Sequence, residues 1–242
     1  MKKTIVITGA SRGIGKAIAI ELAGKDTNIV INCVNNVDKL NEVKSIIEEK
    51  GSVCETFIGD MGNYSDVQKM FDMCLQRFGQ VDVLINNAGI SVVGLFQDMG
   101  ENEWHRICNT NLDSVFNCCH FAVKDMMKQH CGKIINISSV WGLYGASCEV
   151  AYSATKGAVN SFTKALAKEL APSGIQVNAV ACGAIDTEMN GHLSDDDKAS
   201  LAEEIPAGRF GSPQEVAKLV KSLSGMNSYL TGQIITLDGG WI

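Results

Sequence analysis

Short apolar runs that alternate with helical patterns are the feature of this 242-residue sequence that most restricts its fold. Runs such as 4–8 and 81–86 are apolar on both faces, as in parallel strands that helices cover on each side. The alternation of strand and helix therefore predicts an α/β protein with a doubly wound parallel sheet. The expected strands span residues 4–8, 28–33, 53–58, 81–86, 133–138, 175–181 and 233–237.

Between the strands, apolar residues recur every three or four positions, which is typical of helices that bury one face. The expected helices cover residues 13–24, 40–47, 67–75, 104–126 and 159–170. Sheets of this kind bind ligands at the carboxyl ends of their strands, near the point where the strand order reverses. Candidate site residues are therefore sought where the strands end.

No linker rich in Pro, Ser or Gly divides the chain, so a single domain is expected to span residues 1–242. The segment from about 183 to 211 breaks the alternation and is interpreted as a small inserted flap. Within it, Ser194 precedes three aspartates and predicts the start of a helix. Such flaps often cover active sites, and a surface excursion without a role is the alternative.

The composition excludes several classes of function. The net charge is -6 and the pI about 5.2, so we expect no nucleic-acid partner. No apolar run is long enough for a signal peptide or a membrane span. The nine cysteines contain no Cys-x-x-Cys pair and are typical of buried side chains in a reducing cytoplasm. The histidines have no metal-ligand spacing, so no metal site is expected.

A glycine-rich turn follows the first strand, from Thr8 to Gly15. Gly9 permits a tight turn, Gly13 permits close approach of a phosphate, and Gly15 permits close packing of helix on strand. The first N–H groups of the following helix can then bind a pyrophosphate. Three such glycines are weak evidence alone, but their position between strand and helix predicts a dinucleotide site.

The residues after the second strand bear on the choice of dinucleotide. NAD enzymes usually place Asp or Glu here to bind the ribose 2′-hydroxyl, but 32–36 has no carboxylate and the first is Asp38. Arg12 in the glycine turn can bind a 2′-phosphate, although it can equally be a solvated surface side chain. We therefore expect NADP(H) rather than NAD(H).

Two further strand ends carry candidate cofactor contacts. Asp60 ends the third strand and can accept a hydrogen bond from an adenine amino group. Asn86 to Gly89 end the fourth strand, where the small Ala88 and Gly89 leave room for a ribose. Ordinary strand-end turns are the alternative interpretation of both segments.

Tyr152 and Lys156 are four residues apart at the start of an expected helix and so share a face. A neighbouring ammonium favours the phenolate and lowers a tyrosine pKa, which suits a tyrosine that transfers protons. Ser139, at the end of the fifth strand, can hydrogen-bond a substrate oxygen, and Ser138 should point to the opposite face. Asn111 is an unexpected polar residue in an apolar helix and can hold a water linked to Lys156.

Taken together, these residues resemble the short-chain dehydrogenase/reductase family along essentially the whole chain. The family's TGxxxGxG corresponds to Thr8–Gly15, its NNAG to Asn86–Gly89, and its catalytic tetrad to Asn111, Ser139, Tyr152 and Lys156. The resemblance implies a single seven-stranded Rossmann-type domain, commonly a homotetramer with long helices packed between subunits. It implies cofactor contacts from Thr8, Gly9, Ser11, Arg12, Gly13, Ile14, Gly15, Asp60, Met61, Asn87, Ala88, Gly89, Tyr152, Lys156, Ile185 and Thr187.

The family mechanism is implied with these residues. The nicotinamide delivers hydride to a carbonyl carbon, Tyr152 protonates the oxygen, Ser139 positions it, and Lys156 also binds the nicotinamide ribose. The chain departs from the family where Cys182-Gly183 replaces the usual Pro-Gly before the nicotinamide loop. Loss of the stiff proline puts cofactor affinity in question, and Cys182 is a candidate for oxidation if it is exposed.

Within the family, the chain resembles bacterial 3-oxoacyl-[acyl-carrier-protein] reductases of fatty acid biosynthesis, in stretches 8–19, 81–90, 133–140 and 236–242. Arginines that often occur before the fifth and sixth strands of those enzymes are replaced by Gln129-His130 and Pro172-Ser173. An acidic carrier would therefore meet little positive charge there.

Segment 141–150 instead resembles reductases of the 5-aminopentanone modification on elongation factor P. Glu149, with Tyr144, is then a candidate substrate contact, because a carboxylate suits a cationic amino-ketone. The alternative is that Glu149 simply begins a helix. A reductase of small or steroid-like ketones and a cofactor-binding regulatory protein without catalysis are the other hypotheses.

Overall fold

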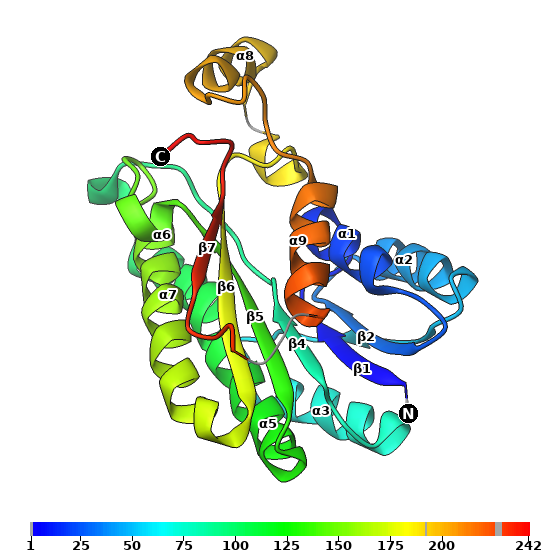
Figure 1. Cartoon of the computed structure of the whole chain (residues 1–242). Helices are drawn as coiled ribbons and strands as arrows, with labels where there is room; N and C mark the ends of the chain where they lie inside the picture. Colours follow the sequence, from blue (N-terminus) through cyan, green and yellow to red (C-terminus); the bar gives the residue numbers. More distant parts are fainter. Residues whose placement is uncertain (1, 192, 226–228) are drawn as a thin grey trace.

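A single sheet of seven parallel strands forms the centre of the computed structural model, which describes residues 2–191, 193–225 and 229–242. The strand order is β3-β2-β1-β4-β5-β6-β7, so the order reverses between β1 and β4 (Figure 1). This confirms the predicted doubly wound α/β fold. The strands are β1 (Lys3–Ile7), β2 (Thr27–Cys33), β3 (Val53–Ile58), β4 (Val83–Asn86), β5 (Gly132–Ser139), β6 (Ile175–Cys182) and β7 (Ile234–Leu237).

The central strands are apolar throughout because both faces of the sheet are buried. In β1, Ile5 and Ile7 belong to the hydrophobic core on one face, whereas Val6 belongs to the core on the other. Ile29 and Val30 of β2 divide in the same way. Consecutive side chains of a strand point to opposite faces, so a continuous apolar run is what two covered faces require.

Helices cover both faces of the sheet, on its two sides in Figure 1. The core on one face is completed by α1 (Gly13–Leu22), α2 (Val37–Glu49) and α9 (Pro213–Gly225). The core on the other is completed by α3 (Tyr64–Phe78), α5 (Ser114–Gln129) and α7 (Val150–Leu170). Helix α9 was not among the expected helices, although its buried Val216, Val220 and Leu223 have helical spacing.

The expected helix over 104–126 is helical throughout, but it is not α-helical in its middle. The structure has α4 (Glu101–Cys108), then a π-helical segment over Asn109–Asp113, then α5. The wider turn changes which side chains face inward, and Asn111 within it is fully buried. Periodicity alone does not reveal such an insertion, because the apolar spacing on either side of it remains helical.

The predicted flap leaves the sheet after β6 and returns at α9, and its residue 192 lies outside the described residues. It contains the short helix η4 (Glu188–Asn190) and α8 (Asp195–Glu204), which projects beyond the rest of the molecule in Figure 1. The predicted helix start is confirmed, since the Ser194 hydroxyl accepts a hydrogen bond from the Asp197 N–H. The described residues of α8 include no buried one, so the core does not depend on this helix. The remaining short helices are η1 (Phe96–Asp98), α6 (Trp141–Tyr144) and η3 (Ala171–Ser173).

We predict that Gly15→Ala destabilises the fold, because the added Cβ would overlap the Gly9 carbonyl oxygen and the Asn87 side chain. The expected loss in free energy of unfolding is about 1–3 kcal/mol, as for other overpacked sites. Gly24→Ala is the matched control, since nothing lies within 4 Å of its added Cβ. Urea denaturation measures both variants, and equal losses would contradict the packing argument.

Candidate active site

The glycine turn has the backbone that its sequence predicts. Gly9 and Gly13 have φ of 64° and 54°, in the left-handed region that favours glycine. Arg12, at the N-cap of α1, makes no side-chain cap, so the first N–H groups of the helix remain available to a ligand. This turn therefore fits the pyrophosphate of a dinucleotide.

Hydrogen bonds join the end of β1 to the end of β4. The Thr8 hydroxyl accepts from the N–H groups of Asn87 and Ala88, both at 3.0 Å. The Asn87 amide donates in return to the carbonyl oxygens of Thr8 and Gly9, at 2.9 and 3.0 Å. The predicted residues of both segments thus form one connected wall at the switch point of the sheet.

Asp60 lies at the next strand end, where its carboxylate already has partners within the chain. It accepts from the Gly62 N–H at 2.9 Å and from the Asn109 amide at 3.2 Å. Met61 is buried at 2% exposure, and its carbonyl oxygen accepts from the Asn117 amide. These contacts fix the loop after β3, and contact of Asp60 with an adenine stays a prediction.

Three of the four predicted catalytic side chains surround the end of β5. Ser139 ends that strand, where its Oγ accepts from the Trp141 N–H at 3.2 Å, and its hydroxyl lies close enough to the Tyr152 phenol, in the first turn of α7, to lower the pKa of that phenol. Lys156, one turn further along α7, donates to the Ile137 carbonyl at 2.8 Å, with its Nζ 5.6 Å from the centre of the Tyr152 ring. The Ser138 hydroxyl instead donates to the Lys156 carbonyl, so the two serines do point to different partners as expected from strand alternation.

Asn111 is held against the loop that follows β4. Its Oδ1 accepts from the Ile90 N–H at 2.8 Å, and its amide donates to the Ile90 carbonyl at 2.9 Å and to the Thr155 hydroxyl. A Cβ added at Gly89 would lie 3.4 Å from Asn111 Oδ1 and 3.5 Å from Lys156 Nζ. Asn111 and Lys156 therefore flank the same glycine, and the water that we expected between them stays a prediction.

Burial dominates the protonation of this cluster. It raises the pKa of Tyr152 above its ordinary value, and the hydrogen bond with Ser139 opposes that shift. Burial also lowers the pKa of Lys156 to about 8. We expected the ammonium to lower the Tyr152 pKa, but it lies over the ring and burial outweighs any such effect. The phenol is consequently held in its protonated form.

Glu149 occupies the N-cap position of α7 but caps no backbone N–H of the helix. Its carboxylate instead accepts a hydrogen bond of 2.5 Å from the Ser91 hydroxyl, across the loop that follows β4. Ser91 was not among the predicted site residues, because nothing in the sequence relates the two loops. The negative charge of Glu149 contributes to the raised pKa of Tyr152, so it lies close to the cluster. Tyr144, at the end of α6, is 63% exposed.

Cys182 ends β6 beside Ser139, and the two residues are paired in the sheet. It is 5% exposed, and burial raises the pKa of its thiol to about 12. The hypothesis of a readily oxidised thiol is therefore wrong for this position. The next residue, Gly183, has no room for a side chain, because a Cβ there would lie 2.7 Å from the Asp238 Cβ.

The expected nicotinamide loop follows Gly183. Ile185 is buried at 5% exposure, and it forms an isolated parallel bridge with Gly211 at the other end of the flap. The Thr187 methyl carbon lies 3.6 Å from the position that a Cβ on Gly13 would take. This loop therefore lies directly against the glycine turn, and its contact with a nicotinamide stays a prediction.

Arg12 contributes to a cluster of charges at the edge of the glycine turn. Its guanidinium lies 2.9 Å from the Glu188 carboxylate of the flap, which Lys39 of α2 also contacts at 3.0 Å. Hydrogen bonds from Lys39 and then Arg12 lower the pKa of Glu188. Lys39 and Glu188 were not among the predicted site residues, because 149 positions separate them along the chain.

The chain belongs to the short-chain dehydrogenase family, whose family model matches residues 3–198. It is accordingly an oxidoreductase that interconverts C=O and CH–OH groups with a nicotinamide cofactor, as the resemblance implied. Within the described residues, no helix is long and apolar enough to cross a membrane. The same residues include no group of three or more His, Cys, Asp or Glu side chains that could hold a metal ion.

Characterised relatives match over nearly the whole chain. The 3-oxoacyl-[acyl-carrier-protein] reductase FabG of Staphylococcus epidermidis is 41% identical over 241 residues, covering 99% of both chains. The enzyme of the same name from Chlamydia trachomatis is 37% identical, covering 99% of this chain and 97% of that one. Among solved structures, "ElxO with NADP Bound" superimposes with a TM-score of 0.91 at 33% identity, covering 100% of this chain and 99% of that chain.

Lys156→Met tests how much the buried ammonium of Lys156 lowers the free energy of unfolding. Burial lowers the pKa of Lys156 from 10.5 to about 8, so the unfolded chain binds this proton more tightly than the folded protein. The penalty is complete below about pH 8 and disappears as the pH rises toward 10.5. Between about pH 7 and about pH 9.5, wild-type stability should therefore rise relative to the variant by about 2 kcal/mol. Urea denaturation at both pH values measures this difference, and a constant difference would contradict it.

Proposed function

We propose that this protein is an NADP(H)-dependent reductase of 3-oxoacyl groups carried as thioesters on acyl carrier protein, a step of fatty acid biosynthesis. The observation that carries the proposal is the contact of Ser139 with Tyr152 at the carboxyl end of the sheet, with Lys156 beside the ring. Relatives with 37–41% identity over nearly the whole chain bear the name of this activity. The intact cluster argues against a regulatory protein that only binds cofactor.

The proposed mechanism assigns each side chain a step. When bound, the nicotinamide supplies the hydride to the carbonyl carbon. Tyr152 donates its phenol proton to the carbonyl oxygen, and the raised pKa keeps that proton in place until negative charge develops there. The Ser139 hydroxyl orients the same oxygen. Lys156, with its pKa near 8, stabilises the phenolate that remains and binds the nicotinamide ribose.

NADP(H) rather than NAD(H) is proposed from the charges beside the glycine turn. Arg12 and Lys39 present two cations to one carboxylate, and segment 32–36 carries no acid that would repel a phosphate. The solved relative named above is described as NADP-bound. The remaining cofactor contacts, among them Asp60, Ile185 and Thr187, are part of this proposal.

Tyr152→Phe removes the proposed proton donor and should lower kcat for NADPH-dependent reduction of an acetoacetyl thioester by about 10²–10⁴-fold. Ser139→Ala should also lower kcat, because the substrate oxygen loses a hydrogen bond. Ser138→Ala is the matched control, since that hydroxyl donates to the Lys156 carbonyl on the other side of the strand from Ser139. Steady-state kinetics with folding checked by circular dichroism measure all three. Full activity in Tyr152→Phe would refute the mechanism.

A second candidate activity is reduction of the 5-aminopentanone modification on elongation factor P. The observation that favours it is the Glu149 carboxylate, which lies close to Tyr152 and accepts a hydrogen bond from Ser91. A carboxylate beside the reacting carbonyl attracts a cationic amino-ketone and disfavours an uncharged acyl chain. The exposed Tyr144 is a candidate contact for the same substrate.

Glu149→Gln distinguishes the two candidates. If the amino-ketone is the substrate, loss of the charge should raise its KM at least tenfold (about 1.4 kcal/mol), with kcat/KM for an acetoacetyl thioester little changed. Side-by-side assays with both substrates measure this, and Ser91→Ala removes the hydrogen bond while retaining the charge. Amino-ketone turnover that is unaffected by Glu149→Gln would exclude the electrostatic argument.

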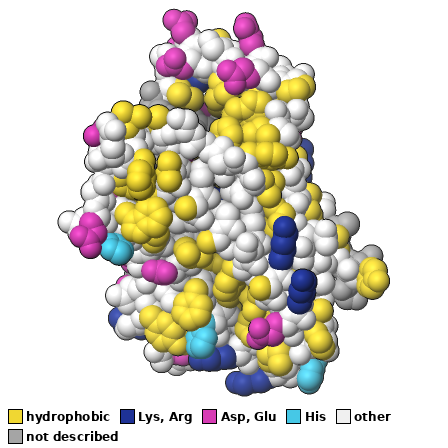
Figure 2. All heavy atoms as spheres, turned by 90° about the vertical axis from the view of Figure 1, so that its left-hand side faces the viewer, with side chains coloured by type: hydrophobic (Ala, Val, Ile, Leu, Met, Phe, Trp, Pro, Cys, Tyr) yellow, Lys and Arg dark blue, Asp and Glu magenta, His cyan; other side chains and the backbone are white. Residues whose placement is uncertain are grey.

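We further propose a cytoplasmic homotetramer in which α5 and α7 pack between subunits. Phe116 of α5 is 49% exposed, and its ring lies 5.7 Å from that of His120. Figure 2 shows apolar patches over the side of the molecule on which α6 and α7 lie. Burial of apolar patches against another copy is favourable. The cysteines, all described and all unpaired, agree with a reducing compartment.

A further inference from the structure

Glu188 connects the flap to two cations at the edge of the glycine turn. It is the first residue of η4, and its two oxygens lie 2.9 Å from Arg12 Nη1 and 3.0 Å from Lys39 Nζ. Arg12 is the N-cap of α1, and Lys39 lies in the first turn of α2. Both helix N-termini add positive potential at this point, and neither N-cap residue makes a side-chain cap. The two cations and the two helix N-termini together can bind an anion. In this structure the anion that they bind is the Glu188 carboxylate of the flap.

The beginning of the flap lies directly on the glycine turn. The Thr187 methyl carbon is 3.6 Å from the position of a Cβ on Gly13, and the Asn190 amide donates to the Ile185 carbonyl at 2.7 Å. A phosphate bound by Arg12 and Lys39 would therefore meet the Glu188 carboxylate. Two anions cannot share these cations without repulsion, so binding of one displaces the other.

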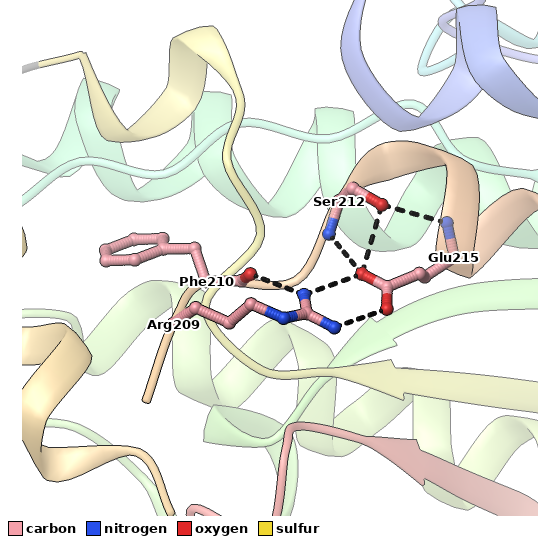
Figure 3. A network of polar contacts seen from close by, with 4 residues as sticks. All are labelled: Arg209, Phe210, Ser212 and Glu215. Carbon is pink, nitrogen blue, oxygen red and sulfur yellow. Dashed lines mark hydrogen bonds and ion pairs between the residues drawn. The ribbon is translucent and has the colours of Figure 1, made fainter. Parts of the chain in front are cut away.

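The other end of the flap is fastened in a different way, which Figure 3 shows. Arg209 forms a bidentate pair with Glu215, at 2.7 and 3.0 Å, and also donates to the Phe210 carbonyl. The same carboxylate accepts from the Ser212 N–H at 2.8 Å and so caps α9. These contacts are local in sequence and involve backbone, whereas the Glu188 carboxylate contacts two exposed side chains from distant segments. Of the two carboxylates, Glu188 is therefore the more easily displaced, while the bridge between Ile185 and Gly211 holds the base of the flap in place.

We propose that Glu188 is a built-in competitor for the 2′-phosphate of NADP(H), which must displace it from Arg12 and Lys39 and thereby releases the flap. This inference rests on the proposed use of NADP(H). A nucleotide without the 2′-phosphate leaves the contact in place, so the flap responds to the phosphate that distinguishes the two cofactors. The competition lowers the apparent affinity for 2′-phosphorylated nucleotides by the fraction of molecules in which Glu188 occupies the cations.

Binding of adenosine 2′,5′-bisphosphate and of 5′-AMP, measured by calorimetry at one ionic strength, tests the proposal without catalysis. Glu188→Gln should tighten binding of the bisphosphate by about two- to tenfold, as expected for release from exposed ion pairs, and leave 5′-AMP unchanged. Asp38→Asn is the matched control, because it removes an equal charge from the first turn of α2, whereas the ion pair of Arg12 among the described residues is with Glu188. An equal gain in bisphosphate affinity in the two variants would show that only the loss of one negative charge matters. That result would overturn the proposal.

Hydrogen exchange of the Asn190 and Gly191 amides, which donate to the Thr187 and Glu188 carbonyls within η4, reports the release of the flap beside Glu188. The bisphosphate should accelerate this exchange in the wild type, and 5′-AMP should not, whereas in Glu188→Gln it should be fast with either nucleotide. Unchanged or slower exchange with the bisphosphate would overturn the proposal. If the wild type binds both nucleotides equally, the proposed preference for NADP(H) is wrong; if it prefers the bisphosphate and Glu188→Gln changes nothing, only the competition is wrong.

Discussion

The hydrogen bonds between Thr8 and the Asn87-Ala88 backbone are the constraint on which the site depends. They join β1 to β4 where the strand order reverses, and crossovers there run to opposite faces of the sheet. Because the crossovers run to opposite faces, they leave the carboxyl end of the sheet uncovered between β1 and β4. Gly13, Gly89 and the flap lie around this uncovered end. A Cβ at position 15 would overlap the Gly9 carbonyl oxygen and the Asn87 amide nitrogen, so the same contact between β1 and β4 requires glycine there.

The side chains proposed for catalysis are polar groups whose burial costs free energy. Lys156 and Asn111 are 5% and 0% exposed, and each is satisfied by the backbone of a neighbouring strand end or loop. Those backbone contacts fix the side chains before any ligand arrives, which is the preorganisation that a proton-transfer site requires. Burial of these polar groups lowers the free energy of unfolding, and the large hydrophobic cores on both faces of the sheet offset that loss.

The sequence predicted the features that depend on local pattern and missed those that depend on distant contacts. All seven strands lie within two residues of their expected positions, because covered strands must be apolar on both faces. Tyr152, Lys156 and Ser139 were identified from spacing, and the structure brings them together. The π-helical segment around Asn111 was missed because it does not disturb apolar spacing. Lys39 could not be related to Glu188, since only the folded flap brings them into contact.

Helix α8 contributes no buried residue among those described, and its capping box is contained within its own first turn. A helix of 10 residues is marginal in water without packing, so its formation is largely uncoupled from folding of the sheet. Mutations in this segment are therefore nearly free of consequences for the core. Sequence changes in this one exposed segment can therefore alter the surface of the flap while the hydrophobic cores and the residues at the carboxyl end of the sheet stay as they are.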